Sequence, residues 1–209
     1  MSEILKLDMH VHTSYSHDGR DPPALVVARA ARIGLDGLAI TDHNNQDGVG
    51  EALDAGREEG ITVIPGIEVS CREGHILLYG SPEFELSGER TAGAVLSILR
   101  DSYPECIAAV AHPFDFYRSG MGWESVKYDF DAVETVNAHS PLPRGAVLGL
   151  CRAIGAGEVG GSDAHSLRSI GKGRTTVSEG AGPILERIVS QGRAEGGFDI
   201  LGLLPRLVG

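Results

Sequence analysis

Short apolar runs alternate with amphipathic stretches along most of this chain. The amphipathic stretches have the pattern of helices that bury one face, and they lie at residues 22–33, 47–59, 91–99 and 144–154. The apolar runs have the length and composition of buried strands. They lie at residues 4–9, 36–40, 61–67, 76–79, 107–111, 132–136 and 158–160, and a last apolar segment follows at residues 184–190.

Proline and glycine support these boundaries. Pro22 and Pro23 suit a first helical turn, and Gly34 and Gly60 stand where two of the helices should end. Alternating strands and helices predict an α/β protein with a parallel sheet and helices packed outside it. Seven strands fit either a compact (β/α) barrel or an open doubly wound sheet. In both architectures the chemistry collects at the carboxyl ends of the strands.

Composition predicts one domain with a sizeable core. The chain has 209 residues, of which 42% are hydrophobic and 22% charged, and we expect a single domain over residues 1–209. The formal net charge of −11 argues against a broad duplex-binding surface, because such a surface needs clustered Lys and Arg. It still allows a short nucleic-acid fragment in a cleft where divalent ions reverse the local sign.

Cysteine usage and the N-terminal residues indicate a soluble, cytoplasmic protein. The three cysteines are odd in number and far apart, with no CxxC pair, so we interpret them as small core residues. Glu3, Lys6 and Asp8 interrupt any apolar stretch of a signal peptide at the N-terminus. No apolar run is long enough to span a bilayer, so no membrane partner is expected.

Histidine, aspartate and glutamate gather where the apolar runs end. His10 and His12 are two residues apart, so on a strand both point to one face. Imidazole and carboxylate without thiolate are typical ligands of zinc, manganese or iron in hydrolytic sites. So many of these residues on one rim exceed the needs of a single tetrahedral ion, which predicts several ions sharing a bridging carboxylate. The segments are Asp8-Met9-His10-Val11-His12-Thr13, Thr41-Asp42-His43, Gly66-Ile67-Glu68, Gly74-His75, Ala111-His112-Pro113 and Gly161-Ser162-Asp163-Ala164-His165.

These ordered segments resemble the PHP (polymerase and histidinol phosphatase) family. The resemblance covers residues 8–165, and its specificity comes from the order of five short motifs. It implies a distorted (β/α)₇ barrel, in keeping with the seven strands counted above. It also implies a cleft at the carboxyl ends of the strands that holds two or three divalent ions (Zn, Mn or Fe).

Carried over motif by motif, the resemblance implies three ion sites. His10, His12, Glu68 and Asp163 would hold one ion, and Glu68 would bridge to a second ion completed by His75 and His112. A third site would use His43, His165 and a residue of the loop 14–18. Asp18, which follows Ser16 and precedes Gly19, is our expected third ligand there, with its neighbour His17 as the alternative.

Several further polar residues have two interpretations. Asp42 is expected to orient a neighbouring ligand or cap its loop instead of binding metal. Glu134 and Asn137 either approach the cleft or are ordinary polar residues at a strand end. His139 lies in a Ser/Pro loop, and we expect it to be solvated.

Basic and aromatic segments supply candidate substrate contacts. Arg168, Lys172 and Arg174 directly follow the last metal-binding motif, where they would either bind a phosphate group or form a plain basic turn. The aromatic residues around Trp123 would either wall a substrate pocket or form a small cluster under the loop 113–129. The apolar C-terminal residues 198–208 would pack on the barrel or mediate a dimer.

The leading hypothesis is a metal-dependent phosphoesterase. Water activated by the ions would hydrolyse a small phosphate ester, and no GxSxG motif or paired Cys and His points to a covalent nucleophile. The resemblance allows histidinol phosphate, a nucleotide or the end of a short single-stranded nucleic acid as substrate. The alternatives are C–N hydrolysis with the same metals, as in amidohydrolases, and a PHP protein that binds metal without catalysis.

Overall fold

The computed structural model of this chain, which describes residues 3–197, contains nine strands in one sheet. The strand order is β7-β6-β5-β4-β3-β2-β1-β8-β9. The strands are β1 (Ile4–Val11), β2 (Gly37–Ile40), β3 (Thr62–Ser70), β4 (His75–Tyr79), β5 (Ile107–Val110), β6 (Ala132–Asn137), β7 (Gly157–Gly161), β8 (Gly173–Ser178) and β9 (Arg193–Gly196).

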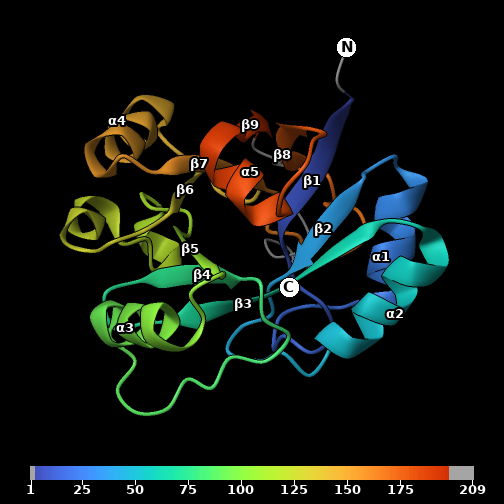
Figure 1. The fold of residues 1–209 in the computed structure, drawn as a ribbon, viewed down its shortest axis with the longest axis horizontal. Helices are drawn as coiled ribbons and strands as arrows, with labels where there is room; N and C mark the ends of the chain where they lie inside the picture. The colour runs from blue at the N-terminus through green and yellow to red at the C-terminus, as the bar shows by residue number, and fades with distance from the viewer. Residues whose placement is uncertain (1–2, 198–209) are drawn as a thin grey trace.

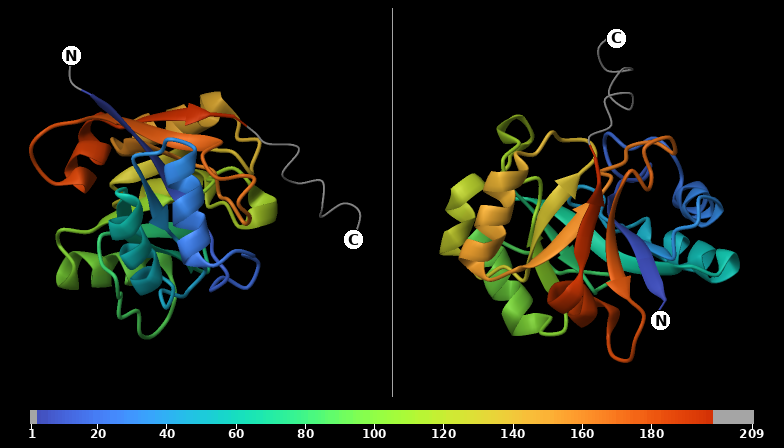
Figure 2. Two further views of the ribbon diagram at one scale, coloured as in Figure 1. Left: turned by 90° about the vertical axis from the view of Figure 1, so that its right-hand side faces the viewer. Right: turned by 90° about the horizontal axis from the view of Figure 1, so that it is seen from above.

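The sheet curls until its two ends meet. β7, at one end of the order, packs against β1, β8 and β9 at the other end, as the views in Figure 2 show. The result is a nearly closed, barrel-like sheet with helices outside it (Figure 1). The expected α/β class and distorted barrel are therefore confirmed, and the open doubly wound alternative is wrong.

Five α-helices cover the sheet, and α1 and α2 pack against each other on its outer side (Figure 1). Pro22 and Pro23 open the first helix as expected, and Gly60 ends the second in a left-handed conformation with φ 71°. The helices are α1 (Pro23–Arg32), α2 (Val49–Glu59), α3 (Ala92–Ser102), α4 (Arg144–Ile154) and α5 (Ile184–Gln191), with the 3₁₀ turns η1 (Phe116–Arg118) and η2 (Gly122–Lys127).

Two features of the sheet correct the sequence-based expectation. β4 is antiparallel to both β3 and β5, and β8 is antiparallel to both β1 and β9, so the sheet is mixed and not parallel throughout. The pattern also missed β8 and β9. β8 buries only alternate residues and carries one large apolar side chain, Val177, while β9 reads Arg-Ala-Glu-Gly. Their pairing comes from backbone hydrogen bonds and not from a hydrophobic run.

Two further expectations concern membrane-spanning helices and the C-terminal segment. No helix within residues 3–197 is both long enough and apolar enough to cross a membrane. The segment 198–208, expected to pack on the barrel or mediate a dimer, lies outside the described residues.

Candidate metal centre

β1 brings three buried polar side chains to one face of the sheet. His10 and His12 alternate with core residues, and their Nε2 atoms lie 3.1 Å apart. Asp8 on the same face does not join them. Its two carboxylate oxygens accept hydrogen bonds from the backbone N–H groups of Ser162 and Gly171, each at 2.8 Å. Asp8 therefore ties β1 to the chain around β7, while the two histidines face the interior of the cleft.

Glu68 lies between two sets of imidazoles. Its Oε2 atom is 3.1 Å from His10 Nε2 and 3.2 Å from His12 Nε2. Its Oε1 atom is 2.8 Å from His75 Nδ1 and 3.0 Å from His112 Nε2. Oε2 also lies 3.3 Å from His43 Nδ1, so one oxygen faces three imidazoles and the other faces two. Separate donor sets at the two oxygens suit a carboxylate shared between ions.

The direction of β4 explains why His75 belongs to this group. β4 runs antiparallel to β3, with Ser70 opposite His75. The first residue of β4 therefore lies at the same rim as the last residues of β3. Sequence order alone places His75 before a strand, and only the antiparallel pairing brings it to the rim where the parallel strands end.

Asp163 completes the first set of donors. Its Oδ1 atom lies 3.2 Å from His12 Nε2 and 3.6 Å from His10 Nε2, and this buried oxygen has no hydrogen-bond partner among residues 3–197. Zinc–nitrogen and zinc–oxygen bonds of about 2.1 Å imply donor–donor separations of roughly 3.4 Å around a tetrahedral ion. The donor set and its spacing therefore fit a metal ion.

A third set of donors involves the loop after β1. Asp18 Oδ2 is 2.9 Å from His165 Nε2 and 3.8 Å from His43 Nε2. His17 Nε2 is 3.9 Å from the same oxygen, and the side chain of His17 is 76% exposed. The structure therefore gathers Asp18, His43 and His165, with His12 close enough to share an ion, while His17 lies at the edge of the group.

The charges of this site call for cations. Burial would lower the pKa of His12, but Asp163 and Glu68 raise it to about 9. Burial would raise the pKa of Glu68, but the imidazoles of His10, His112 and His12 hold it well below its usual range. The buried carboxylates therefore favour positive charge beside them, either as protons on the imidazoles or as metal ions, and the close nitrogen donors fit metal ions.

Polar residues behind the cluster hold its histidines. Glu134 Oε1 lies 2.9 Å from His10 Nδ1, and Glu134 Oε2 accepts the backbone N–H of His112 at 2.7 Å. The amide of Asn137 donates to the same oxygen at 3.0 Å and to Asp163 Oδ2 at 3.1 Å. Of the two interpretations of Glu134 and Asn137, the structure therefore supports the one in which they approach the cleft. Asp42 accepts hydrogen bonds from the N–H and the hydroxyl of Thr13, both at 2.6 Å, and so holds the loop after β1, next to His12, against the end of β2.

The backbone is strained at two of these positions. His112 and Asp163 have φ values of 26° and 52°, a region that residues other than glycine rarely adopt. Such strain is characteristic of sites whose side chains must point in one particular direction.

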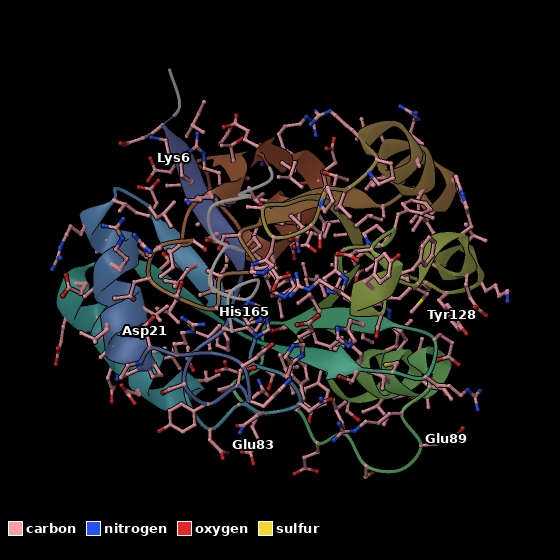
Figure 3. All side chains as sticks on the ribbon, turned by 180° about the vertical axis from the view of Figure 1, so that it is seen from behind. Lys6, Asp21, Glu83, Glu89, Tyr128 and His165 are labelled. Carbon is pink, nitrogen blue, oxygen red and sulfur yellow. The ribbon has the colours of Figure 1, made fainter. Side chains whose placement is uncertain are left out.

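The structure corrects the expectation for His139. Its side chain is buried, with 7% exposure, and its ring centroid lies 5.2 Å from that of His165. The Ser/Pro loop after β6 folds back toward the metal-binding cluster, so a loop whose composition is typical of solvated loops is buried in the protein. The metal-binding cluster is the set His10, His12, Asp18, His43, Glu68, His75, His112, Asp163 and His165. Figure 3 labels His165, which lies near the middle of the molecule in that view.

Basic residues near the site differ from those singled out by the sequence. Arg168 and Lys172 are exposed, and Arg174 lies on β8 with its guanidinium 3.4 Å from Glu195. The cation beside the cluster is Arg118 of η1, whose guanidinium contacts Asp163. No sequence pattern indicated Arg118, because it lies six residues beyond His112 in an irregular loop.

The metal-binding cluster opens into a cavity of about 300 Å³. The expected aromatic wall is in part present. Tyr117 lines the cavity, whereas Trp123 packs on Phe114 in a small aromatic cluster, with the two ring centroids 5.7 Å apart. The lining residues are His17, Asp18, His43, Ser70, His75, His112, Tyr117, Arg118 and Ser119.

A family model described as the PHP domain matches residues 8–147, and a second described as PHP-associated matches residues 147–193. The chain belongs to the PHP domain family. The PHP match begins inside β1, extends through β6 and includes most of the metal-binding cluster, and the PHP-associated region supplies Asp163 and His165.

Three proteins illustrate the range of similarity. An uncharacterized protein of Methanocaldococcus jannaschii is 29% identical over 148 residues, which are 65% of this chain and 83% of that protein. A phosphoribosyl 1,2-cyclic phosphate 1,2-diphosphodiesterase of Eggerthella lenta is 39% identical over 82 residues, 36% of this chain and 31% of that enzyme. A solved two-domain protein of Bacteroides vulgatus, containing a predicted PHP-like metal-dependent phosphoesterase, shares the fold. Its TM-score is 0.76 at 19% identity, covering 94% of this chain and 66% of that chain.

Proposed function

We propose that this protein is a metal-dependent phosphoesterase that hydrolyses a small phosphate ester, which would be histidinol phosphate, a nucleotide or the end of a short single strand. A monoester would give an alcohol and inorganic phosphate, and a strand end would release a nucleotide. The observation that carries the proposal is the position of Glu68, whose two oxygens face separate sets of imidazoles, three at Oε2 and two at Oε1. The cavity beside Glu68 holds about 300 Å³, which suits a small ester or the last nucleotide of a single strand. Membership of the PHP family supports the proposal, and so does the similarity to a phosphodiesterase and to a protein containing a predicted PHP-like metal-dependent phosphoesterase.

Three groups of residues would hold the ions. His10, His12, Glu68 and Asp163 form the first, and Glu68, His75 and His112 the second. Asp18, His43 and His165 form the third. Zinc, manganese or iron bound there would supply Lewis acidity, neutralise phosphoryl oxygens and activate the attacking water.

The side chains around these groups have distinct tasks in hydrolysis. Glu134 holds the His10 ring from behind, so that the other ring nitrogen faces the cluster. The Arg118 guanidinium brings a permanent positive charge to the cavity wall. In the net reaction water supplies the oxygen of a new P–O bond, the bond from phosphorus to the leaving oxygen breaks, and a proton reaches the alcohol.

A cytoplasmic location is part of the proposal. Its support is chemical, since Cys71, Cys106 and Cys151 are all free. Extracellular proteins usually pair such residues in disulfides.

Phosphate release by reloaded protein tests the function. Protein stripped of metal is reloaded with manganese, zinc or iron and assayed on histidinol phosphate, AMP, a 3′,5′-bisphosphonucleoside and a short single strand. We expect turnover of at least one ester, lost in chelator and competitively inhibited by inorganic phosphate. Metal-loaded protein that releases neither inorganic phosphate from the monoesters nor a nucleotide from the strand would contradict the proposal and favour C–N hydrolysis or a non-catalytic role.

A further inference from the structure

The backbone after β2 stays paired with β3 beyond the end of the regular strand. An isolated parallel bridge places His43 opposite Glu68. The N–H of Glu68 donates to the carbonyl of Asp42 at 3.2 Å, and the N–H of Asn44 donates to the carbonyl of Glu68 at 2.9 Å. The backbones of His43 and Glu68, two residues proposed to hold ions, are therefore fixed side by side.

The ring of His43 takes its direction from this backbone. His10 has a carboxylate behind its ring, since Glu134 Oε1 lies 2.9 Å from its Nδ1 atom. In the part of the chain that the structure describes, Nδ1 of His43 is buried and has no hydrogen-bond partner. It faces Glu68 Oε2 at 3.3 Å, which belongs to the metal-binding cluster itself. The position of the His43 ring thus depends on what holds the main chain on either side of it.

Asn44 holds that main chain through its side chain. Its Nδ2 atom donates to Ser70 Oγ at 3.0 Å, and its Oδ1 atom accepts the N–H of Ser70 at 3.0 Å. The guanidinium of Arg90, in the loop between β4 and α3, donates to the same Oδ1 atom. Asn44 has a φ of 52°, a left-handed conformation that asparagine adopts more readily than most residues. The residue directly after His43 is therefore attached to the last residue of β3.

The exposure of Asn44 separates positioning from stability. Asn44 is exposed and Ser70 is half-buried, so water can replace the hydrogen bonds that they would lose. Ser70 also lines the cavity of the metal-binding cluster. A change at Asn44 should therefore affect the neighbouring ion group more than the free energy of unfolding.

We propose that Asn44 is a positioning residue that sets the direction of His43 in the third ion group. By holding the backbone after His43 against β3, it keeps His43 Nε2 3.8 Å from Asp18 Oδ2, with His165 close enough to share an ion. The ion of this group is then the one most sensitive to Asn44. The inference rests on the ion groups of the proposed function and is independent of the substrate.

Zinc binding at buffered free concentrations tests the assignment without turnover. The probe is Zn²⁺ alone, counted per chain after equilibrium dialysis. Asn44→Gly removes the side chain and suits the left-handed backbone, so it should fold. We expect it to weaken one ion about tenfold and to leave the others within threefold of the wild type. Asn44→Asp keeps the oxygen that accepts from Ser70 and Arg90, and it should bind that ion within threefold of the wild type.

Gln46 provides a matched control in the same loop. Its amide also makes three hydrogen bonds, from Nε2 to the carbonyls of Gly66 and Ser81 and from the N–H of Phe84 to Oε1. None of these three partners is proposed to hold an ion. Gln46→Ala should therefore keep every zinc affinity within threefold of the wild type. An equal loss of zinc in Gln46→Ala and Asn44→Gly would overturn the specific role of Asn44.

His43→Ala identifies the ion concerned. It should weaken the same single ion, and adding Asn44→Gly to it should change no remaining zinc affinity by more than twofold, because both residues act on one ion. A further loss in the double variant would mean that Asn44 supports the whole site and not His43 in particular. That result, or zinc binding by Asn44→Gly equal to that of the wild type, would overturn the inference.

The outcomes also separate this inference from the proposed function. Zinc binding by the wild type without hydrolysis of any ester would overturn the phosphoesterase function and leave the role of Asn44 standing. Wild-type protein that binds no zinc would overturn the ion groups, and this inference would fail with them.

Discussion

Glu134 Oε1 lies 2.9 Å from Nδ1 of His10, on the side of the ring opposite the Nε2 atom that faces the metal-binding cluster. A carboxylate in this position fixes the histidine tautomer and makes the other nitrogen a better ligand. We therefore expect Glu134→Gln to weaken metal binding by about 10- to 100-fold. Competition with a chromogenic chelator measures the change. An unaltered metal affinity would show that His10 needs no partner behind it.

Glu68→Ala should remove metal from two groups of donors at once. Its Oε2 atom faces three imidazoles and its Oε1 atom faces two others, so this carboxylate contacts both groups. Metal content per chain should fall below that of the wild type by at least one ion, and phosphate release should be abolished. Glu59→Ala, an exposed change at the end of α2, is the matched control. Near-normal turnover in Glu68→Ala would contradict the shared carboxylate.

His139→Ala and His17→Ala should differ in their effects. His139 is buried beside His165, and truncating a buried side chain of this size typically costs about 1–3 kcal/mol of unfolding free energy. His17 is 76% exposed, so its replacement should be almost silent in stability and in metal content. Urea unfolding and metal analysis of the two variants provide the comparison. A silent His139→Ala would mean that the loop after β6 does not pack on the cluster.

Gly161→Ala should destabilise the protein strongly, because an added Cβ would lie 2.4 Å from the Cβ of His10. β1 would have to move away from β7, and overpacking of this kind costs about 1–3 kcal/mol. Gly50→Ala is the counterpart, since nothing lies within 4 Å of the added methyl group in α2. We expect that variant to gain about 0.5–1 kcal/mol from the higher helix propensity of alanine. Thermal or urea unfolding distinguishes the two, and equal stability of both would contradict this account of the strand contact.

Cys71 should react slowly with thiol reagents in the folded protein. Burial, with the charge of Glu73, raises its pKa to about 12. Raising the pKa lowers the reactive thiolate at a given pH, so at pH 8 about one molecule in 10⁴ carries it, against roughly a quarter for an ordinary thiol. Labelling with iodoacetamide should therefore be about a thousandfold slower than in guanidinium-unfolded protein. Fast native labelling of Cys71, located by mass spectrometry, would contradict the burial of its thiol.

Most residues of the metal-binding cluster, and the helices around it, could be predicted from the order of residues along the chain. His10 and His12 share a face because side chains alternate along any strand, and Glu68 and His112 follow from parallel strands ending at one rim. Pro22 and Gly60 limit their helices through local backbone preferences. These features depend on neighbours a few residues apart, and such neighbours leave a readable pattern.

Contacts between residues far apart in the chain depend on how the strands and loops pack in three dimensions. The antiparallel course of β4 brought His75 to the rim, and the curling of the sheet brought Glu134 against His10, 124 residues away. Arg118 reached the cavity through an irregular turn, and the loop of His139 folded inward. Each depends on strand direction or loop path, which the packing of the whole barrel sets and local composition does not.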